Sequence, residues 1–556
     1  MQPPRFNIAQ AMQDAVGLHR QGLLRDAEKL YARVLKAAPD NFDALHLLGS
    51  LKAQAGQMGE ALRLISAAVK INPRVPEALV NLANVMHALK RDADALDCLD
   101  RALAIKPDDV QALQNRGAAL LSLNRPRDAL ETFDKIVARE PRNAQALLNR
   151  GVAKATLGLH TQALADFDAA LAAAPGQPQI LYNRGNALME LARPAEAVAA
   201  FDRAVAAVSG HAAAWNNRGR ALQQLNRHAE AVQSFDRATA QQKDYADALF
   251  NRSLSLLTLG DLKQGFAQYE WRWKRSGVTD TRRGYNKPLW LGEFPLGQRA
   301  ILLHAEQGLG DTIQFARYAP ILARAGAKVV LEVQPELRAL LADLDGIASC
   351  HARGEALPAY DVHCPFGSLP LALKTEPATI PAGIPYLRAD EQRMAKWRPV
   401  IEALPGKRVA LAWAGQVSHA NDRNRSIDLK LLEPLLSLEG ISFVSIQRDL
   451  RADDATLLAR HANVTPVGDR LTDMADTAAV AALADLTIAV DTSVVHLAGA
   501  LGRPVWVMLP FTPDWRWTLS GERSPWYPQT RLFRQPALGD WASVIAQLRD
   551  ALAAQT

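Results

Sequence analysis

The stretch "QNRGAALLSLNRPRDALETFD", residues 114–134, contains the unit that decides the fold. Its tripeptide "NRG" recurs every 34 residues, beginning at Asn115, Asn149, Asn183 and Asn217, and returns as "NRS" at Asn251. Asparagine is a mediocre helix former because its side chain competes for nearby backbone groups. Its return at one fixed position therefore needs a reason beyond helix formation.

Other residues keep the same period. Prolines lie at Pro39, Pro73, Pro107, Pro141 and Pro175; small residues lie at Gly49, Ala83, Gly117, Gly151, Gly185 and Gly219; alanines lie at Ala61, Ala95, Ala129, Ala163, Ala197 and Ala231; aromatic residues lie at Phe133, Phe167, Phe201 and Phe235. The small residues mark close helix contacts, and each aromatic residue follows an alanine by one helical turn. A 34-residue period with these marks is the tetratricopeptide (TPR) pattern. It predicts an all-α solenoid of about eight repeats over residues 1–279, right-handed and with a concave groove.

The recurring asparagine is expected on the groove wall. Six are in phase, namely Asn81, Asn115, Asn149, Asn183, Asn217 and Asn251. An amide offers donors and an acceptor, which suits the backbone of a bound polypeptide. The alternative is that each asparagine bonds within its own hairpin or to the next repeat. The arginine that follows it is either solvated or paired with the acidic residue of "FD" in a neighbouring repeat.

The pattern changes after the repeats. Residues 280–298 are predicted to be a connector, because they are rich in Gly, Pro and aromatic residues. Apolar runs then alternate with helical stretches, first "RAILLHA" and "AKVVLEV", and later "RVALAWAG", "ISFVSIQ", "NVTPVG", "LTIAVD" and "PVWVMLP". This alternation predicts parallel sheets in two Rossmann-like units, residues 299–400 and 401–556, facing a cleft. Ligands bind such sheets at the carboxyl ends of the strands.

The first candidate junction reads "ILLHAEQGLGDTIQFARY". Gly308 and Gly310 let the chain turn after the strand and leave backbone N–H groups open. Asp311 is expected at the start of a helix, pointing into the cleft. It is either a catalytic group or a helix N-cap, a role that aspartate fills well.

Two further junctions are polar. The loop "WAGQVSHANDRNRSIDL" contains Arg425, whose planar guanidinium suits a diphosphate, unless the loop is merely solvated. The segment "DTSVVHLAGALGRP" combines Asp491, Thr492, Ser493 and His496 at an expected helix N-terminus, an anion-binding arrangement. Its alternative interpretation is a capped helix with a packed histidine. Candidate contacts to a nucleoside or its loops are Trp413, Gln416, Asn424 and Gln447, with core packing the alternative for the tryptophan.

Composition sets broader limits. The net charge of +6 over 556 residues does not argue for nucleic acid, and no apolar run is long enough for a membrane span. Three cysteines, Cys98, Cys350 and Cys364, form no disulfide framework and fit a cytoplasmic location. The pairs "CH" at Cys350 and "HC" at His363 match no common zinc spacing and are expected at strand ends.

The three junctions together resemble glycosyltransferase family 9, the heptosyltransferase-like enzymes of GT-B fold, over about Ala300 to Leu552. The resemblance implies that Asp311 is the catalytic base and that Arg425 takes the place of the family's usual lysine. The family's "DTG…HLA" phosphate-binding segment corresponds to "DTSVVHLA", with Ser493 in place of a glycine. The layout of repeats before a transferase is similar to bacterial TPR glycosyltransferases, including flagellin-modifying ones. The asparagine series resembles the ladder of the eukaryotic O-GlcNAc transferase, which holds acceptor polypeptides.

The resemblance implies an inverting protein glycosyltransferase that moves a sugar from a nucleotide sugar to Ser or Thr of a polypeptide in the TPR groove. The acceptor would be a protein or peptide, including flagellin-like proteins. No cofactor and no divalent metal are expected, because Arg425, His496 and a helix N-terminus would neutralise the diphosphate. Two alternatives stay open: a heptosyltransferase-like enzyme for glycans or lipids that uses its repeats for recruitment, and a catalytically inactive scaffold.

Overall fold

The computed structural model describes residues 6–278, 284–418 and 421–555. Residues 280–283 of the predicted connector lie outside the described residues. The chain divides into two compact units, Met1–Gly210 and His211–Thr556. This boundary falls within the repeats, ahead of the domain boundary predicted after residue 279. The last two predicted repeats therefore belong to the same compact unit as the α/β region.

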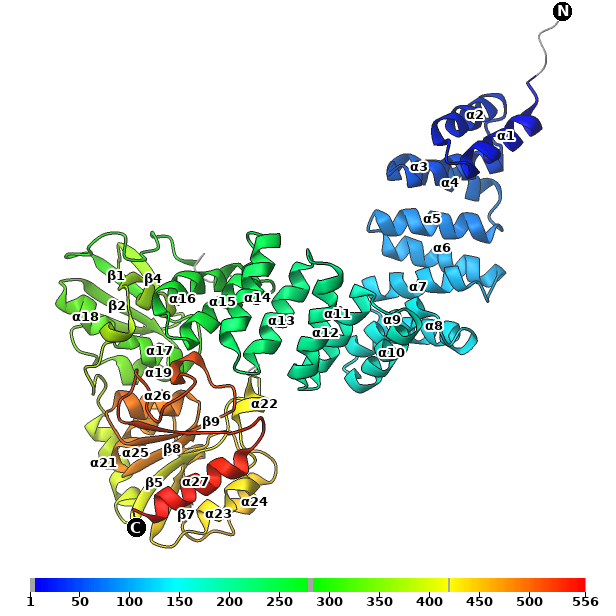
Figure 1. Ribbon diagram of the computed structural model, residues 1–556. Coiled ribbons are helices and arrows are strands. Elements are labelled where there is room, and N and C mark those ends of the chain that lie inside the picture. The colour runs from blue at the N-terminus through cyan, green and yellow to red at the C-terminus, as the bar shows by residue number, and fades with distance from the viewer. Residues whose placement is uncertain (1–5, 279–283, 419–420, 556) are drawn as a thin grey trace, which may run out of the picture. The chain divides into compact units, whose positions relative to one another are not determined.

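The N-terminal half is built from helical hairpins, as the 34-residue period predicts (Figure 1). The helices are α1 (Ile8–Arg20), α2 (Leu24–Ala37), α3 (Phe42–Gln54), α4 (Met58–Ile71), α5 (Pro76–Ala88), α6 (Asp92–Ile105), α7 (Val110–Ser122), α8 (Pro126–Arg139), α9 (Ala144–Thr156), α10 (His160–Ala173), α11 (Pro178–Glu190), α12 (Pro194–Ala207), α13 (Ala212–Gln223), α14 (His228–Gln241), α15 (Ala246–Thr258) and α16 (Leu262–Tyr269). Each odd-numbered helix packs against the even-numbered helix that follows it.

Every hairpin turn uses one residue in the left-handed region. These residues also recur every 34 positions: Gly22, Gly56, Lys90, Asn124, Gly158, Ala192, Asn226 and Gly260. Glycine adopts positive φ without strain, and asparagine tolerates it. Ala192, with φ of 54°, carries a Cβ in a conformation that disfavours it. The turn geometry is thus set by the repeat, even where the residue type is a poor choice.

The recurring glycine allows the two helices of a hairpin to touch. A Cβ added to Gly151 would lie 2.5 Å from Cε1 of Phe167, and the same distance separates a Cβ at Gly185 from Cε1 of Phe201. These phenylalanine rings are fully buried. The aromatic residue of the second helix therefore fills the space that the missing side chain leaves, as the shared period predicts.

The arginine of the "NRG" tripeptide bonds to the aspartate sixteen residues earlier, which lies on the second helix of the preceding repeat. The bonds are Arg116 to Asp100 (2.7 Å), Arg150 to Asp134 (3.0 Å), Arg184 to Asp168 (2.7 Å) and Arg252 to Asp236 (2.7 Å). Of the two interpretations left open for this arginine, pairing with a neighbouring repeat is the one observed. The tripeptide thus joins consecutive repeats.

One repeat carries an additional buried ion pair. Asp166 on α10 is buried, and it bonds to Arg150 (2.6 Å) and to Lys154 (2.7 Å) on α9. One period later the positions of Lys154 and Asp166 are occupied by Leu188 and Ala200, and one period earlier by Leu120 and Thr132. The lysine therefore stands where both neighbouring repeats have leucine.

The α/β region contains two sheets whose recorded strand pairs are all parallel. Their strands are β1 (Ala300–His304), β2 (Lys328–Val333), β3 (Ser349–Ala352), β4 (Val362–Pro365), β5 (Lys407–Ala412), β6 (Ile441–Ser445), β7 (Val464–Pro466), β8 (Leu486–Val490), β9 (Val505–Leu509) and β10 (Thr530–Arg534). The strand orders are β3-β2-β1-β4 and β10-β9-β8-β5-β6-β7. Numbered from β5, the second order is the 3-2-1-4-5-6 arrangement of a doubly wound sheet.

Helices cover both faces of the second sheet (Figure 1). The helices of the α/β region are α17 (Leu309–Ala316), α18 (Ala319–Arg324), α19 (Pro335–Leu341), α20 (Leu369–Ala372), α21 (Glu391–Ile401), α22 (Asp422–Arg425), α23 (Glu433–Leu436), α24 (Asp454–Leu458), α25 (Met474–Leu483), α26 (Ser493–Ala500) and α27 (Trp541–Ala553). One core joins residues of α25 and α26 to the first sheet, and a second core lies under α23 and α27. None of the helices in the described ranges is both long and apolar enough to cross a bilayer.

Candidate functional site

The three predicted junctions all follow the carboxyl ends of strands. The first follows β1, the second follows β5 and the third follows β8. In each sheet the order reverses beside β1 or β5, because β4 and β8 lie on their other side. Such switch points are where doubly wound sheets bind ligands. The topology thus places the three junctions at the edges where a site is expected.

Asp311 is the third residue of helix α17, whose N-cap position is taken by Gly308. Its carboxylate accepts a hydrogen bond from the Gly308 N–H (3.0 Å) and is ion-paired with Arg516. The side chain keeps 24% of its surface exposed. Asp311 therefore supports the first turn of the helix from inside it, rather than as the N-cap, and still presents a carboxylate to solvent.

Arg516 is a site residue that the sequence analysis missed. It lies in the motif "DWRW" on the short 3-10 helix η7 (Trp515–Trp517), after β9, and its side chain is only 8% exposed. Besides Asp311, it bonds to Asp514 (2.8 Å) and to the Gln314 side chain on α17. The signal available in the sequence was an arginine between two tryptophans, but its partner is 205 residues away.

The first and third junctions are in direct contact. A Cβ on Gly310 would lie 2.7 Å from Cδ2 of His496 and 3.5 Å from the Ser493 Cα, so only glycine fits against α26 here. His496 is buried, and its ring stacks on Trp517 with 5.5 Å between centroids. The predicted cleft is therefore closed at this point by helix N-termini that touch.

His496 does not supply positive charge at neutral pH. Burial, and then the charges of Arg516 and Arg317, hold the pKa of this histidine well below its ordinary value. Its Nδ1 lies 3.2 Å from the Tyr527 hydroxyl. The role of His496 in binding a diphosphate stays a prediction; in this structure the residue packs and offers a neutral ring.

Arg425 of the second junction and Asp491 of the third junction are in contact. Arg425 Nη1 donates to the Asp491 carbonyl oxygen at 3.0 Å, and its Nε is buried without a hydrogen-bond partner among the described residues. A Cβ on Gly415 would lie 2.5 Å from Arg425 Nη2, so the glycine makes room for the guanidinium. Arg425 is thus positioned at the end of β8 with donor capacity to spare.

Acidic charge accumulates at the end of β8. Burial, and then the charge of Asp514, raise the pKa of Asp491 to about 7. Thr492 takes the N-cap position of α26 without a side-chain capping bond, and its Oγ1 is buried with no partner in the described structure. Ser493 is the first residue of the helix. Thr492 therefore occupies the N-cap position, but its hydroxyl does not make the capping hydrogen bond that this interpretation expects.

The nucleoside candidates are placed differently from one another. Trp413 is fully buried, with its indole N–H 3.3 Å from Asp454, so its ring has no face open to a ligand. Gln447 accepts from the Trp413 and Ala414 N–H groups and holds the end of β5. Gln416 and Asn424 are exposed. Trp413 and Gln447 thus have structural partners, and the other two lie on the surface.

The groove asparagines are all half-buried, but they differ in their bonds. Asn81 donates to Ser50 (3.3 Å), and Asn115 donates to Asn84 (2.6 Å). In both cases the acceptor lies 31 residues earlier, in the preceding repeat. Asn251 donates to Asn216 (3.0 Å). These amides follow the alternative interpretation, in which the side chain bonds between repeats.

Asn149 and Asn183 are different. The residues 31 positions before them are Ala118 and Val152, which offer no side-chain acceptor. The Asn149 oxygen accepts from Gln145 (3.1 Å), and its amide nitrogen has no partner among the described residues; the Asn183 side chain likewise makes no hydrogen bond there. The preceding repeat therefore decides which asparagine side chains are bonded across the repeat boundary.

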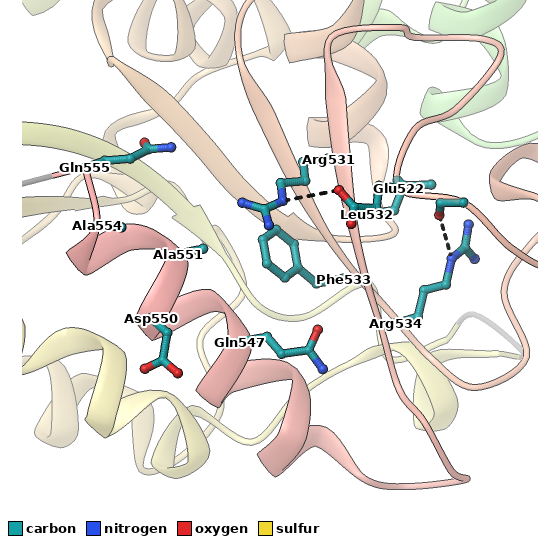
Figure 2. Close-up of a pocket in the computed structure, with 11 residues that line it drawn as sticks. Glu522, Arg531, Leu532, Phe533, Arg534, Gln547, Asp550, Ala551, Ala554 and Gln555 are labelled. Atoms are coloured by element: carbon teal, nitrogen blue, oxygen red, sulfur yellow. Dashed lines mark hydrogen bonds and ion pairs between the residues drawn. The ribbon is translucent and has the colours of Figure 1, made fainter.

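Figure 2 shows residues of β10 and α27 that line a hollow. The volume of this hollow is about 750 Å³. Arg531 lies 4.0 Å from Glu522 in its wall, and Arg534 donates to the Gly521 carbonyl at 3.2 Å. None of the predicted site residues lines it. In the described part of the chain, no three His, Cys, Asp or Glu side chains are grouped as a metal site would need.

Comparisons with known proteins identify the repeats. A tetratricopeptide-repeat family model matches residues 17–76, 115–178, 182–246 and 219–271, and a second such model matches 52–120. Protein FlbA of Caulobacter vibrioides is 27% identical over 321 residues, which cover 53% of this chain and 53% of FlbA. The chain therefore matches only about half the length of this relative.

Two solved structures resemble parts of the chain. A tetratricopeptide repeat protein from Parabacteroides merdae is 19% identical and covers 45% of this chain and 98% of its own, with a TM-score of 0.38. PilW, a type IV pilus biogenesis factor, is 25% identical and covers 36% of this chain and 92% of its own, with a TM-score of 0.34. The family models and the helical hairpins show that the N-terminal half of the chain is an array of tetratricopeptide repeats, and an α/β region with two parallel sheets follows it.

Proposed function

We propose that this protein is a glycosyltransferase of GT-B type that transfers a sugar from a nucleotide sugar to Ser or Thr of a polypeptide held by its repeats. The observation that carries the proposal is the convergence of the three junctions. Asp311, Arg425 and the N-terminus of α26 come from separate strand ends, yet α17 touches α26 and Arg425 bonds at Asp491. This is the residue set that the family resemblance implies.

The chemistry needs a proton acceptor and a site for negative charge. In the proposed reaction the Asp311 carboxylate takes the proton of the acceptor hydroxyl, whose oxygen forms the new bond to the sugar. The bond between the sugar and the diphosphate breaks, and the nucleoside diphosphate leaves with the electron pair. Arg425, whose Nε lies 4.0 Å from Asp422 and has no hydrogen-bond partner among the described residues, and the backbone of α26 stabilise that charge. His496 remains neutral and packs against Gly310.

The acceptor is proposed to bind at the middle of the asparagine series. Asn149 and Asn183 have amide N–H groups that no described residue occupies, and an extended backbone offers carbonyl acceptors. The Asn81 amide bonds to His46 and Ser50 of the preceding repeat, and the Asn115 amide is held by its bond to Asn84. The proposal therefore assigns Asn149 and Asn183 to acceptor binding, and Asn81 and Asn115 to the structure of the array.

Transfer can be tested with a purified flagellin as acceptor and a panel of UDP-, GDP-, dTDP-, ADP- and CMP-linked sugars. Intact-mass spectrometry should show one donor adding the mass of a sugar. Asp311→Asn should lower the rate by about 100- to 10,000-fold, the size of a lost general base. Asp514→Asn is the matched control, because it removes the other carboxylate on Arg516 and should retain most of the rate. Equal loss in both variants would remove Asp311 from the role of base.

Acceptor binding needs its own test. Asn149→Ala with Asn183→Ala should raise the acceptor KM about tenfold or more, since two hydrogen bonds are lost, and should leave donor binding unchanged. Asn115→Ala is the control, because it breaks the bond to Asn84. It should instead lower the stability of the array by about 1 kcal/mol with an unchanged acceptor KM. An unchanged KM in the double variant would rule out these two asparagines as the acceptor site.

A scaffold without catalytic activity is the second candidate. It is favoured by one observation: Arg516 is already ion-paired with Asp311, and the N-termini of α17 and α26 touch. It predicts that calorimetry with the same donor panel detects no binding. Binding of any one donor, displaced by its free nucleoside diphosphate, would exclude this candidate.

A further inference from the structure

The array ends in the segment "YEWRW", and this segment lies inside the α/β unit. Tyr269 ends α16, and the 3-10 helix η1 (Glu270–Lys274) follows. Phe266 meets Trp515 edge-on, with ring centroids 5.5 Å apart, so the last repeat packs directly against the "DWRW" loop. Tyr269 and Phe266 belong to the same core as the first sheet. The end of the array is thus continuous with the site.

Arg272 is the polar centre of this contact. Its side chain is 7% exposed and bonds to Glu306 (3.0 Å), to Ser368 (2.7 Å) and to Glu270 (2.6 Å). Glu306 lies in the loop after β1 and is 3% exposed. A charge buried this deeply is tolerated only with partners, so the pair fixes the Glu306 backbone against the last repeat.

The opposite side of Glu306 is also fixed. The Gly367 N–H donates to Glu306 Oε1 at 3.2 Å, and a Cβ at Gly367 would lie 2.5 Å from that oxygen. Only a residue without a side chain lets the β4 loop approach the carboxylate so closely. Glu306 is therefore clamped between the last repeat and the loop after β4.

The fixed segment leads directly to Asp311. Gln307 donates to the Tyr269 hydroxyl at 2.8 Å, and its carbonyl accepts from Gln334 at 2.8 Å. Gly308 follows, and its N–H is the hydrogen bond that Asp311 accepts. Three consecutive residues of the loop thus connect the last repeat to the carboxylate.

A second contact holds the loop that carries Arg516. The side chain of Asn226, in the turn between α13 and α14, donates to the Phe511 carbonyl at 2.6 Å. The Thr512 hydroxyl donates to the Gln224 carbonyl at 3.3 Å. The repeats from His211 onward therefore touch both chain segments that meet in the ion pair of Asp311 and Arg516.

We propose that Arg272 is a positioning residue for the transfer reaction, which acts through Glu306 to hold the loop that presents Asp311. The last two repeats are then part of the reaction site, and they do more than extend the groove. The inference rests on the proposed function for its effect on transfer. Its structural part, the clamping of residues 306–311 by the last repeat, is independent of that function.

Hydrogen exchange on the full chain tests the structural part without any ligand. In Arg272→Gln, the amides of residues 306–312 should exchange at least about tenfold faster than in the unaltered protein. Arg252→Gln is the matched control, because it breaks an ion pair with Asp236 in the same unit and should leave these amides unchanged. Unchanged protection of residues 306–312 in a folded Arg272→Gln protein would overturn the proposal.

Transfer kinetics test the positioning role. Arg272→Gln should lower kcat about 100-fold, as small misplacements of a reacting group do, and change the donor KM by less than about threefold. Arg272→Lys, which keeps the charge, should recover part of kcat. Absence of transfer in the unaltered protein would instead refute the proposed function and leave the exchange result standing.

A double variant separates position from stability. Arg272→Gln with Glu306→Gln removes both charges of this pair and leaves only Glu270, which still accepts from Ser368, without its ion-pair partner. Its melting temperature should therefore recover in part relative to either single variant. Loop protection and kcat should stay low, because two amides do not reproduce the clamp. Recovery of all three properties together would show that the pair is structural only and would overturn the proposal.

Discussion

The repeats of the first unit and the last two repeats follow the same sequence rule but have different surroundings. Asn124 and Asn226 occupy the same position of the period, and both form the hairpin turn with positive φ (55° and 57°). Asn226 also donates to the Phe511 carbonyl in the α/β region. One local requirement, a residue that tolerates the left-handed region, is thus reused for a long-range contact. The 34-residue period predicts the hairpin turn but not the contact with Phe511.

The largest expected effect is a loss of stability in the second unit, residues 211–556. Arg516→Gln removes the positive charge between Asp311 and Asp514, two carboxylates held at the site. Breaking a buried ion pair costs about 3–5 kcal/mol, and the loss should fall on the second unit alone. Chemical denaturation of the full chain measures the loss in free energy of unfolding, and hydrogen exchange of each unit shows where the loss falls. Arg549→Gln, which breaks an exposed pair with Asp550, should cost less than about 1 kcal/mol.

The corresponding test in the first unit uses the ion pair at one helix crossing. Asp166→Ala leaves Lys154 and Arg150 without their shared partner and should destabilise the array by about 3 kcal/mol, the low end for a buried pair, because Arg150 keeps Asp134. Adding Lys154→Leu restores the apolar pair found one repeat later and should return most of that stability. The melting temperatures of the two variants test this prediction. A double variant that melts no higher than Asp166→Ala would mean that this helix crossing requires its charges.

A smaller effect is the pH dependence of the stability of the second unit, which contains Asp491. The pKa of Asp491 is raised to about 7 in the folded protein, so folding favours its protonated form. Its stabilising contribution is complete below the ordinary aspartate pKa and is lost as the pH rises through 7. Asp491→Asn should therefore flatten the fall in stability of the second unit between pH 5 and pH 8. An equal slope in this variant would assign the fall to other groups, among them Glu306, whose pKa burial raises to about 7.

The smallest effect concerns one turn of the first unit. Ala192→Gly should stabilise the array by about 1 kcal/mol, because glycine adopts the left-handed conformation without strain. The same substitution at exposed Ala199, inside helix α12, should destabilise it by about as much. Thermal unfolding of the two variants should move in opposite directions. A shift of the same sign in both would show that the turn is not strained.

The repeats were predictable because their contacts are short in sequence. Gly151 and Phe167 are 16 residues apart, and their shared period is enough to predict that they touch. The same reasoning left the arginine of "NRG" open, since either solvation or a partner fits a charged residue on a helix. The bonds of Asn149 and Asn115 differ because of the residue 31 positions earlier. This contact could be recognised only from the packing between consecutive repeats in the structure.

The site was predictable only in its separate parts. Strand ends and glycines located Asp311, Arg425 and Asp491, because doubly wound sheets bring such ends together. Arg516 was missed because its partner lies more than 200 residues away and no periodicity joins them. The lowered pKa of His496 could not be predicted for a similar reason, since the charges of Arg516 and Arg317 that add to the effect of burial come from segments distant in sequence.

The ion pairs that join consecutive repeats affect how such an array can evolve. Each arginine reaches the aspartate sixteen residues earlier, so duplication of one complete 34-residue unit recreates a pair at every new junction. A partial duplication would leave charges without partners. The contacts of Asn226 and Arg272 with the α/β region cannot be duplicated in this way, because they depend on a specific surface. The array is therefore free to lengthen ahead of His211, while its C-terminal end is fixed by the region it supports.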